Sequence, residues 1–483
     1  MEWVILFGYS IALAIICAFS IEQFNLAMIY RRFKSKKSKE IRTIISFPKV
    51  TVQLPVYNEK YVIERLIDCV CQLEYPKDKL EIQVLDDSND ETLGLSKSRI
   101  NYWSGKGVNI TLVVRENRDG FKAGALAHGL TKSNGEFIAI FDADFLPGFD
   151  FLLKTIPYFD EGIGMVQTKW GHINEDYSLL TKMQAFGLNA HFSIEQTGRA
   201  SSGKFMNFNG TAGVWRKTCI EEAGGWQHDT LTEDLDLSYR AQMKGWKFVF
   251  MEGVVTPAEL PVIVPAIKSQ QYRWNKGAAE TARKNLGTIL KSKISKTVKF
   301  HAAMHLLSST TFVFLLIASM LSLPMLILKA SNPNMKLAYD MGSIFVIGFL
   351  AMAFFYWISS KSNRPFKTIQ YYLFHFPLFV MFSMGMSLHN AIAVTEGYLG
   401  FKTPFIRTPK FAIQTKADSW KGNIYLSKVI SPITLFEGLL AIYFAFAVAY
   451  GLYIGDYGLI LFHLMLTFGF GAVFIYTISS LDE

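Results

Sequence analysis

Long apolar runs lie near both ends of the chain, with a stretch of ordinary soluble character between them. The first run extends from about Trp3 to Ile29, which is long enough to cross a bilayer as one helix. Four later runs have similar lengths and few charges, at about 301–328, 341–359, 433–450 and 457–478. The pattern predicts membrane-spanning helices toward both ends and a separate domain in the middle of the 483 residues.

The middle of the chain, from about Lys49 to Gly253, alternates short β-rich runs with amphipathic helical stretches. Four runs are almost continuously apolar, as is typical of strands buried on both faces: KVTVQLPVYN, LEIQVLDD, ITLVVR and EFIAIFDAD. Helices are expected to open near Glu59 and near Gly120. Strands that alternate with helices in this way predict an α/β fold with a largely parallel sheet.

Basic residues follow the first apolar run at once and indicate its orientation. They are Arg31, Arg32, Lys34, Lys36, Lys37 and Lys39. Because basic residues collect on the cytosolic side of a membrane span, we expect the N-terminus outside and the middle domain in the cytosol. A cleaved signal peptide would be shorter and would carry its basic residues before the apolar run, so this run is expected to be an anchor.

A fifth apolar run, at about 371–394, is ambiguous. Residues that a lipid-exposed span tolerates poorly interrupt it, namely His375, Pro377, Gly385, His389 and Asn390. Basic loops flank the run at 361–367 and 402–410, and both lie on the cytosolic side only if the run does not cross. We therefore expect five spans, with this run lying along the interface or re-entering the membrane.

Charge and cysteine content narrow the classes of function. The formal net charge is +9, but many basic residues flank the apolar runs, so nucleic acid is not an expected partner. The four cysteines, Cys17, Cys69, Cys71 and Cys219, lack zinc-ligand spacing and are too few for a disulfide framework. They fit a reducing compartment, and no metal or redox role is assigned to them.

Two acidic pairs stand at the C-terminal ends of predicted strands. Asp86 and Asp87 follow IQVL, and Asp142 and Asp144 follow FIAIF. Ligands bind at this edge of an open parallel sheet, so both pairs are expected to face one crevice. An Asp-x-Asp pair there can hold Mg²⁺ or Mn²⁺, which neutralises a diphosphate leaving group. The alternative is that the carboxylates cap the next helix.

Two turns between strands and helices carry further candidates. The strand LPVYNE ends in a turn that suits backbone N–H groups for binding a nucleotide, although Asn58 could simply cap the next helix. Lys122, in GFKAGAL, lies at a glycine-flanked helix start where its ammonium group can meet a phosphate. A solvated surface lysine is the alternative there.

The segment before the second span carries a candidate base. Thr232, Glu233 and Asp234 precede the amphipathic segment LDLSYRAQMKGW, so they either cap its helix or supply Asp234 as a general base. In QQYRW, which follows, Arg273 can clamp phosphate oxygens. Trp274 beside it either stacks on a sugar ring or anchors the chain at the membrane interface.

One known family has these motifs in the same order. The series LPVYNE, DD, FKAGAL, DAD, FNGTAGVWR, TED, QxxRW, membrane spans and RTPK resembles the processive family 2 glycosyltransferases related to cellulose synthase. It is especially similar to the cellulose-synthase-like glucomannan and xyloglucan-backbone synthases. The likeness is dense over about residues 45–280, where FNGTAGVWR and EAGGW are near-verbatim, and thinner as far as Ser419.

The resemblance implies a fold and a reaction. The expected fold is an α/β GT-A (nucleotide-diphospho-sugar transferase) catalytic domain joined to an α-helical transmembrane domain. The expected reaction uses a cytosolic active site, a UDP- or GDP-sugar donor and Mg²⁺ or Mn²⁺, and it inverts the donor to a β-linkage.

The resemblance also assigns roles to positions of this chain. Asp234 matches the catalytic base, and Asp142 and Asp144 match the metal and diphosphate site. The donor-binding positions are Tyr57, Glu59, Asp86, Asp87, Lys122, Asp142, Gln270, Arg273 and Trp274. The acceptor-binding positions are Asn209, Gly210, Thr211, Glu233 and Trp274. Thr408 and Lys410 correspond to a gating loop that closes over the donor, here in the RTPK form in place of the FxVTxK form.

These expectations divide the chain into five parts. Residues 1–30 are a transmembrane helix, 31–48 a basic cytosolic linker, 49–257 the GT-A domain, 258–300 an amphipathic interfacial segment with QxxRW, and 301–483 a transmembrane region. The last part holds four spans, the interfacial or re-entrant run and the cytosolic RTPK loop.

The expected function is an inverting, processive transferase that polymerises a β-linked glucan, mannan or glucomannan and exports the growing chain through its spans. A non-processive transferase that adds one sugar to a membrane lipid is the alternative, since ceramide glucosyltransferases share DxD and QxxRW. RTPK and the four C-terminal spans favour the polymer. A transporter or scaffold with a lapsed transferase domain would have lost an acidic site, yet every expected carboxylate is present. The sequence leaves open the sugar, the oligomeric state and accessory export subunits.

Overall fold

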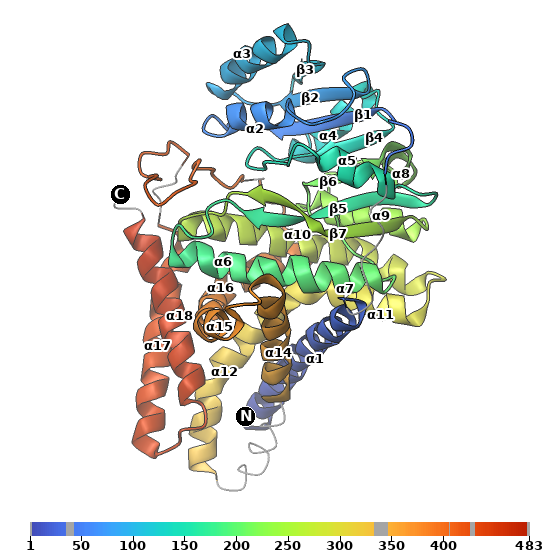
Figure 1. The fold of residues 1–483 in the computed structure, drawn as a ribbon. Coiled ribbons are helices and arrows are strands. Elements are labelled where there is room, and N and C mark those ends of the chain that lie inside the picture. The colour runs from blue at the N-terminus through green and yellow to red at the C-terminus, as the bar shows by residue number, and fades with distance from the viewer. Residues whose placement is uncertain (1, 35–42, 333–345, 405, 426–429, 481–483) are drawn as a thin grey trace.

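The computed structural model describes residues 2–34, 43–332, 346–404, 406–425 and 430–480. A β-sheet with its helices forms one layer of the molecule, and long helices gather on one side of it (Figure 1). Lys36, Lys37 and Lys39 of the predicted linker lie outside the described residues, as do the first five residues of the run predicted at 341–359.

The sheet has seven strands in the order β3-β2-β1-β4-β6-β5-β7. They are β1 Val50–Val56, β2 Leu80–Asp86, β3 Ile110–Val113, β4 Phe137–Ile140, β5 Ile163–His172, β6 Gly213–Arg216 and β7 Lys247–Ala258. The four strands predicted from apolar runs, β1 to β4, pair in parallel, as expected. β6 runs antiparallel to both β4 and β5, so the sheet as a whole is mixed.

Helices cover both faces of the sheet, because β1 and β2 are apolar on both sides. One face packs against α2 (Ile63–Val70), α3 (Thr92–Gly105) and α5 (Phe151–Thr155). The other packs against α4 (Phe121–Lys132), α8 (Lys217–Glu222) and α9 (Glu233–Met243). The C-terminal ends of β1, β2 and β4 are thereby left as an edge between two helical layers.

Three further helices lie between the sheet and the apolar helices (Figure 1). They are α6 (Leu179–Ala190), α7 (Gln196–Ser201) and the long α10 (Val264–Lys291), and a π-helical turn at His191–Glu195 joins the first two. α6 begins at a capping box of Ser178 and Thr181, in which each side chain bonds the other residue's backbone N–H.

Four helices of the described chain are long and apolar enough to cross a bilayer. They are α1 (Glu2–Lys34), Ser308–Ser331 including α12 (Thr311–Ser331), α17 (Pro432–Ile454) and α18 (Ile460–Ser479). The run predicted to start at His301 is broken, because α11 (Lys296–Leu306) is a separate helix whose His301 is buried against Glu22 of α1. α14 (Val346–Asn363), the described part of the run at 341–359, is not among the four.

The ambiguous run forms two helices, α15 (Thr368–Gly385) and α16 (Ser387–Leu399), bent by 53° at the break. Such a pair is either a broken span or a re-entrant loop. α15 packs tightly on α18, since a Cβ built on Gly385 would lie 2.2 Å from the carbonyl oxygen of Gly469. α16 packs on α10, where a Cβ on Gly397 would lie 2.7 Å from the carbonyl oxygen of Lys276.

Candidate active site

A cavity opens at the C-terminal ends of the parallel strands. The turns after β1, β2 and β4 and the start of α4 form one side of it, and Arg273 of α10 and the loop after α16 form the other. Nine residues predicted from the sequence line it: Tyr57, Glu59, Asp87, Lys122, Asp142, Asp144, Arg273, Thr408 and Lys410. They come from six separate parts of the chain, and carboxylates and cations dominate the set. The cavity therefore suits a ligand that is anionic and that also offers hydroxyl groups.

Lys122, at the start of α4, joins three of the motifs. Its Nζ donates to Asp142 Oδ1 (2.5 Å) and to the carbonyl oxygen of Gly210 (2.9 Å). It also lies 4.0 Å from the Glu233 carboxylate. The helix starts after Gly120, whose positive φ of 70° suits glycine. Lys122 is thus a paired cation inside the site and not a solvated surface lysine.

The loop after α16 supplies the opposite wall of the cavity. Lys410 Nζ lies 2.8 Å from Asp144 Oδ2, and the Thr408 hydroxyl oxygen accepts from Arg273 Nη2 at 2.9 Å. Within the described part of the chain, Asp144 Oδ1 is buried and has no hydrogen-bond partner. A buried carboxylate oxygen that faces no protein donor retains the capacity to bind a divalent cation.

Glu59 and Tyr57 form one side of the cavity together with two arginines, Arg118 and Arg407, that the sequence analysis did not predict. Arg407 Nη1 lies 2.9 Å from Glu59 Oε2, and the Arg118 guanidinium stacks 3.3 Å from the centre of the Tyr57 ring. Burial raises the pKa of Glu59 to about 7, although Arg407 opposes the rise. Both arginines line the cavity and add positive charge where an anionic ligand would lie.

Asp234 stands next to this charge cluster. A Cβ built on Gly210 would lie 3.1 Å from Asp234 Oδ2 and 3.4 Å from Lys122 Nζ, so both groups converge on this glycine. Burial raises the pKa of Asp234 to about 7, and the adjacent Glu233 carboxylate adds to the rise. A carboxylate with such a pKa can accept a proton at neutral pH, as a general base requires.

The capping interpretations are not seen in the structure. Thr232 precedes α9 without a side-chain cap, and its hydroxyl lies 3.2 Å from that of Thr281 on α10. Asn58 does not cap α2, which begins five residues later. Its side chain instead exchanges hydrogen bonds with Asn89 after β2 (2.9 and 3.1 Å). The polar residues of both turns therefore form hydrogen bonds to other elements and do not cap the helix that follows them.

The FNGT turn, predicted to line the acceptor site, is tied to the same cluster. The Thr211 hydroxyl accepts from the backbone N–H of Asp142 (2.9 Å). Asn209 lies deeper, where its side chain contacts His191 Nε2 (3.0 Å) and accepts from Gln196 Nε2 (2.5 Å). The turn thus links the Asp-x-Asp segment to the π-helical turn above the apolar helices.

Like Asp234, Glu233 and the FNGT turn, the last three predicted residues, Asp86, Gln270 and Trp274, are not among the residues that line the cavity. Asp86 is fully buried and accepts a hydrogen bond from Ser96 of α3 (2.6 Å), which holds the end of β2. Gln270 and Trp274 lie on α10 beside Arg273, and the Trp274 ring is 6.5 Å from that of Trp170. A role for these residues in binding stays a prediction.

Comparison with known proteins gives consistent matches. The family model described as glycosyltransferase like family 2 matches residues 48–277. The probable glucomannan 4-beta-mannosyltransferase 4 of Oryza sativa subsp. japonica is 44% identical over 58% of this chain, and the match spans about half of that relative (52%). The probable glucomannan 4-beta-mannosyltransferase 3 of the same species is 37% identical over 86% of this chain and 75% of the relative.

One solved structure shares the fold. It is the mannosyltransferase PcManGT from Pyrobaculum calidifontis in complex with GDP-Man and Mn²⁺. The two chains superpose with a TM-score of 0.53 at 20% identity, over 80% of this chain and 99% of the other.

Proposed function

Because this chain belongs to glycosyltransferase family 2 and is a relative of the glucomannan 4-beta-mannosyltransferases, we propose that it is an inverting, processive β-glycan synthase. The catalytic domain has the GT-A fold expected from the sequence and is joined to long apolar helices. The observation that carries the proposal is the convergence of Lys122, Asp142, Gly210 and Glu233 beside Asp234.

In the proposed reaction Asp234 accepts the proton of an acceptor hydroxyl while that oxygen bonds to the anomeric carbon of the donor sugar. The bond from the anomeric carbon to the diphosphate oxygen breaks at the same time, and attack from the opposite face inverts the centre. Arg273, Lys122 and Lys410 line the cavity, and in the proposed reaction they balance the charge of the diphosphate as it leaves.

Asp142 and Asp144 are proposed to hold Mg²⁺ or Mn²⁺. The buried, unbonded Asp144 Oδ1 and the part-exposed Asp142 carboxylate fit such an ion, since hard divalent cations prefer carboxylate oxygens. The ion would supply Lewis-acid neutralisation of the leaving diphosphate. Lys122 and Lys410 contact the same two carboxylates, and with an ion bound there their ammonium groups would pair with phosphate oxygens.

The position of the loop after α16 supports both its gating role and the predicted topology. Arg407, Thr408 and Lys410 all contact residues of the cavity, so the loop and the catalytic domain lie on one side of any membrane. The preceding helix pair also starts near that domain, where Arg364 Nη2 donates to Glu175 Oε1 at 2.6 Å. We therefore propose that α15 and α16 re-enter, with the catalytic domain in the cytosol and the N-terminus outside.

We propose GDP-mannose as the donor, since the relatives carry the name glucomannan 4-beta-mannosyltransferase and the solved neighbour binds GDP-Man. The product would be a β-1,4-linked mannan or glucomannan that leaves through the apolar helices. Accessory export subunits would be required only if the helices of one chain do not form a complete path.

The test is to incubate membranes that contain the protein with labelled GDP-mannose and, separately, with UDP-glucose. Products are then sized and digested with a β-mannanase. We expect long, mannanase-sensitive chains from GDP-mannose, and none from the Asp234→Asn variant. A single sugar on an organic-soluble lipid would instead establish the non-processive alternative, and long chains from UDP-glucose alone would reject the mannosyl donor.

A further inference from the structure

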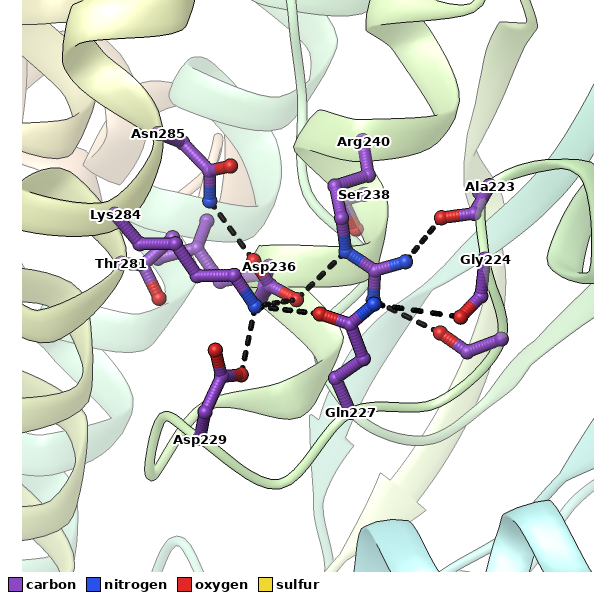
Figure 2. A network of polar contacts seen from close by, with 12 residues as sticks. Ala223, Gly224, Gln227, Asp229, Asp236, Ser238, Arg240, Thr281, Lys284 and Asn285 are labelled. Atoms are coloured by element: carbon purple, nitrogen blue, oxygen red, sulfur yellow. Dashed lines mark hydrogen bonds and ion pairs between the residues drawn. The ribbon is translucent and has the colours of Figure 1, made fainter.

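Figure 2 shows a network of polar contacts among residues none of which lines the cavity. Its centre is Asp236, on α9 two residues after Asp234, and its side chain is fully buried. The Asp236 carboxylate accepts three hydrogen bonds, from Arg240 Nε (2.8 Å), Lys284 Nζ (3.0 Å) and Asn285 Nδ2 (2.8 Å). Lys284 and Asn285 belong to α10, so the network joins the two helices that carry Asp234 and Arg273.

The two cations of the network also fasten the loop between α8 and α9. Lys284 Nζ donates to Gln227 Oε1 (2.7 Å) and Asp229 Oδ1 (2.6 Å), which together with Asp236 uses all three of its protons. Arg240 donates to the carbonyl oxygens of Ala223 and Gly225. A buried carboxylate with this many charged partners holds one position, since each displacement would break several charge-assisted bonds.

The contact continues along one face of α10 toward the cavity. Glu280 Oε2 accepts from the backbone N–H of Leu231 (2.7 Å). A Cβ built on Gly277 would lie 2.5 Å from Thr232 Cγ2, so only glycine lets the TED turn approach α10 this closely. Gly277, Glu280 and Lys284 recur at intervals of three and four residues, and Arg273 stands one turn before them on the same face.

We propose that Asp236 and Lys284 are positioning residues, which fix the start of α9 against α10 and so set where the Asp234 carboxylate stands relative to Arg273. The inference rests on the proposed function, because it concerns the base of that reaction. Neither residue lines the cavity, and Lys284 contacts Asp236 on α9, the helix that also carries Asp234, so both act through the position of that helix. Placement matters for the rate, because a displacement of about 1 Å can lower turnover by about 10²-fold.

The test compares Asp236→Asn and Lys284→Met with the wild type over a range of pH, using purified full-length protein in detergent. We expect kcat to fall roughly 10- to 100-fold, with the KM for the donor little changed. The acidic limb of the kcat profile should also move to lower pH, because water that reaches Asp234 would lower its raised pKa. A loss of folded protein alone would lower the rate by the same factor at every pH and would leave the acidic limb of the profile where it is.

Three further variants separate positioning from stability. Lys284→Arg keeps donors to Asp236 and should restore most of the rate. Asn285→Ala removes one donor but leaves the ion pair, so it should shift the limb in the same direction even where Asp236→Asn does not fold. Asp68→Asn breaks a comparable carboxylate contact, with Arg99 and Trp103 across α2 and α3, and should leave the limb in place.

Two outcomes overturn the inference, and they differ from failure of the proposed function. One is an unchanged rate and limb in the folded variants at Asp236, Lys284 and Asn285. The other is an equal shift in Asp68→Asn. If the wild type itself transfers sugar from neither GDP-mannose nor UDP-glucose, the proposed function fails and the inference fails with it.

Discussion

At the scale of single residues, the cavity balances each acidic side chain of the Asp-x-Asp segment with a lysine. Lys122 contacts Asp142, and Lys410 contacts Asp144 from the loop on the opposite side. A divalent cation bound to these carboxylates would displace the lysines toward the phosphates of the donor. Without the nucleotide the two lysines balance the two carboxylates, and with it the cation would balance the carboxylates while the lysines balance the phosphates.

The base assignment predicts a pH dependence. The Asp234 carboxylate must be ionised to accept a proton, and its raised pKa lies near 7, so kcat should fall about tenfold for each pH unit below 7. The Asp234→Asn variant should lose roughly 10²-fold or more in kcat at pH 8 while it still binds the donor. Turnover and donor titration at several pH values check this, and near wild-type turnover in the variant would remove the assignment.

Metal removal tests the two aspartates of the cavity. EDTA should abolish transfer, and Mn²⁺ or Mg²⁺ should restore it, because the diphosphate would otherwise leave without a compensating divalent charge. Asp144→Asn removes a charge from the proposed ligand set, so it should raise the concentration of Mn²⁺ needed for half-maximal rate. Full activity in chelator would instead mean that Arg273, Lys122 and Lys410 suffice for the diphosphate.

The sequence predicted most of the cavity wall, and the residues it missed share a reason. Asp142, Lys122 and Thr408 stand in short motifs whose residue types suggest chemistry directly. Arg118 and Arg407 reach the cavity because their loops contact Tyr57 and Glu59 in the turn after β1, and a local pattern does not carry that information. Asp86 is the opposite case: its motif predicts a place in the cavity, but its carboxylate accepts a hydrogen bond from Ser96 of α3.

At the scale of elements, several contacts anchor the loop after α16 on the catalytic domain, and two of them lie far apart along the loop. The first is Lys410 on Asp144. The second is Tyr425, whose ring carries the Arg407 guanidinium at 4.0 Å and whose hydroxyl donates to Asp90 in the turn after β2. A loop held at points this far apart, with Arg407 on Glu59 as a further contact, can cover the donor as one unit.

The proposed gating role predicts a change in product length. Thr408→Ala combined with Lys410→Ala removes the contacts to Arg273 and Asp144, so elongation should stop early and chains should be shorter. Lys416→Ala, at an exposed lysine of the same loop, is the matched control and should leave chain length unchanged. Products of wild-type length from the double variant would show that the loop does not gate.

The sequence predicted best those strands that are buried on both faces, because burial on both faces requires a continuous run of apolar residues. β1 and β2 are such strands, whereas β5 is buried at its start and only half-buried toward His172, so its run is less continuous. The apolar pattern from His301 predicts one continuous helix, but Ser308 and Ser309 lie in a 3₁₀ turn that separates α11 from α12. Contacts between distant segments, such as His301 with Glu22, decide these boundaries.

At the scale of the whole molecule, long apolar helices gather on one side of the catalytic domain, and the proposed membrane topology can be tested directly. A cysteine placed at Ser419, in a background without the native cysteines, should resist a membrane-impermeant reagent in intact cells. A cysteine at Tyr457, exposed in the turn between α17 and α18, should react from outside. Labelling of Ser419 from outside would contradict the five-span topology and the gating role together.

The face of α10 that joins Arg273 to Lys284 also limits how this chain can change in evolution. Lys284 follows Arg273 by eleven positions, which is close to three helical turns, so both side chains share one face. A single inserted or deleted residue between them would rotate every downstream contact by about 100°. Members of the family should therefore vary freely in side chains on the outer face of this helix, while an alignment of them keeps the interval between the two positions free of gaps.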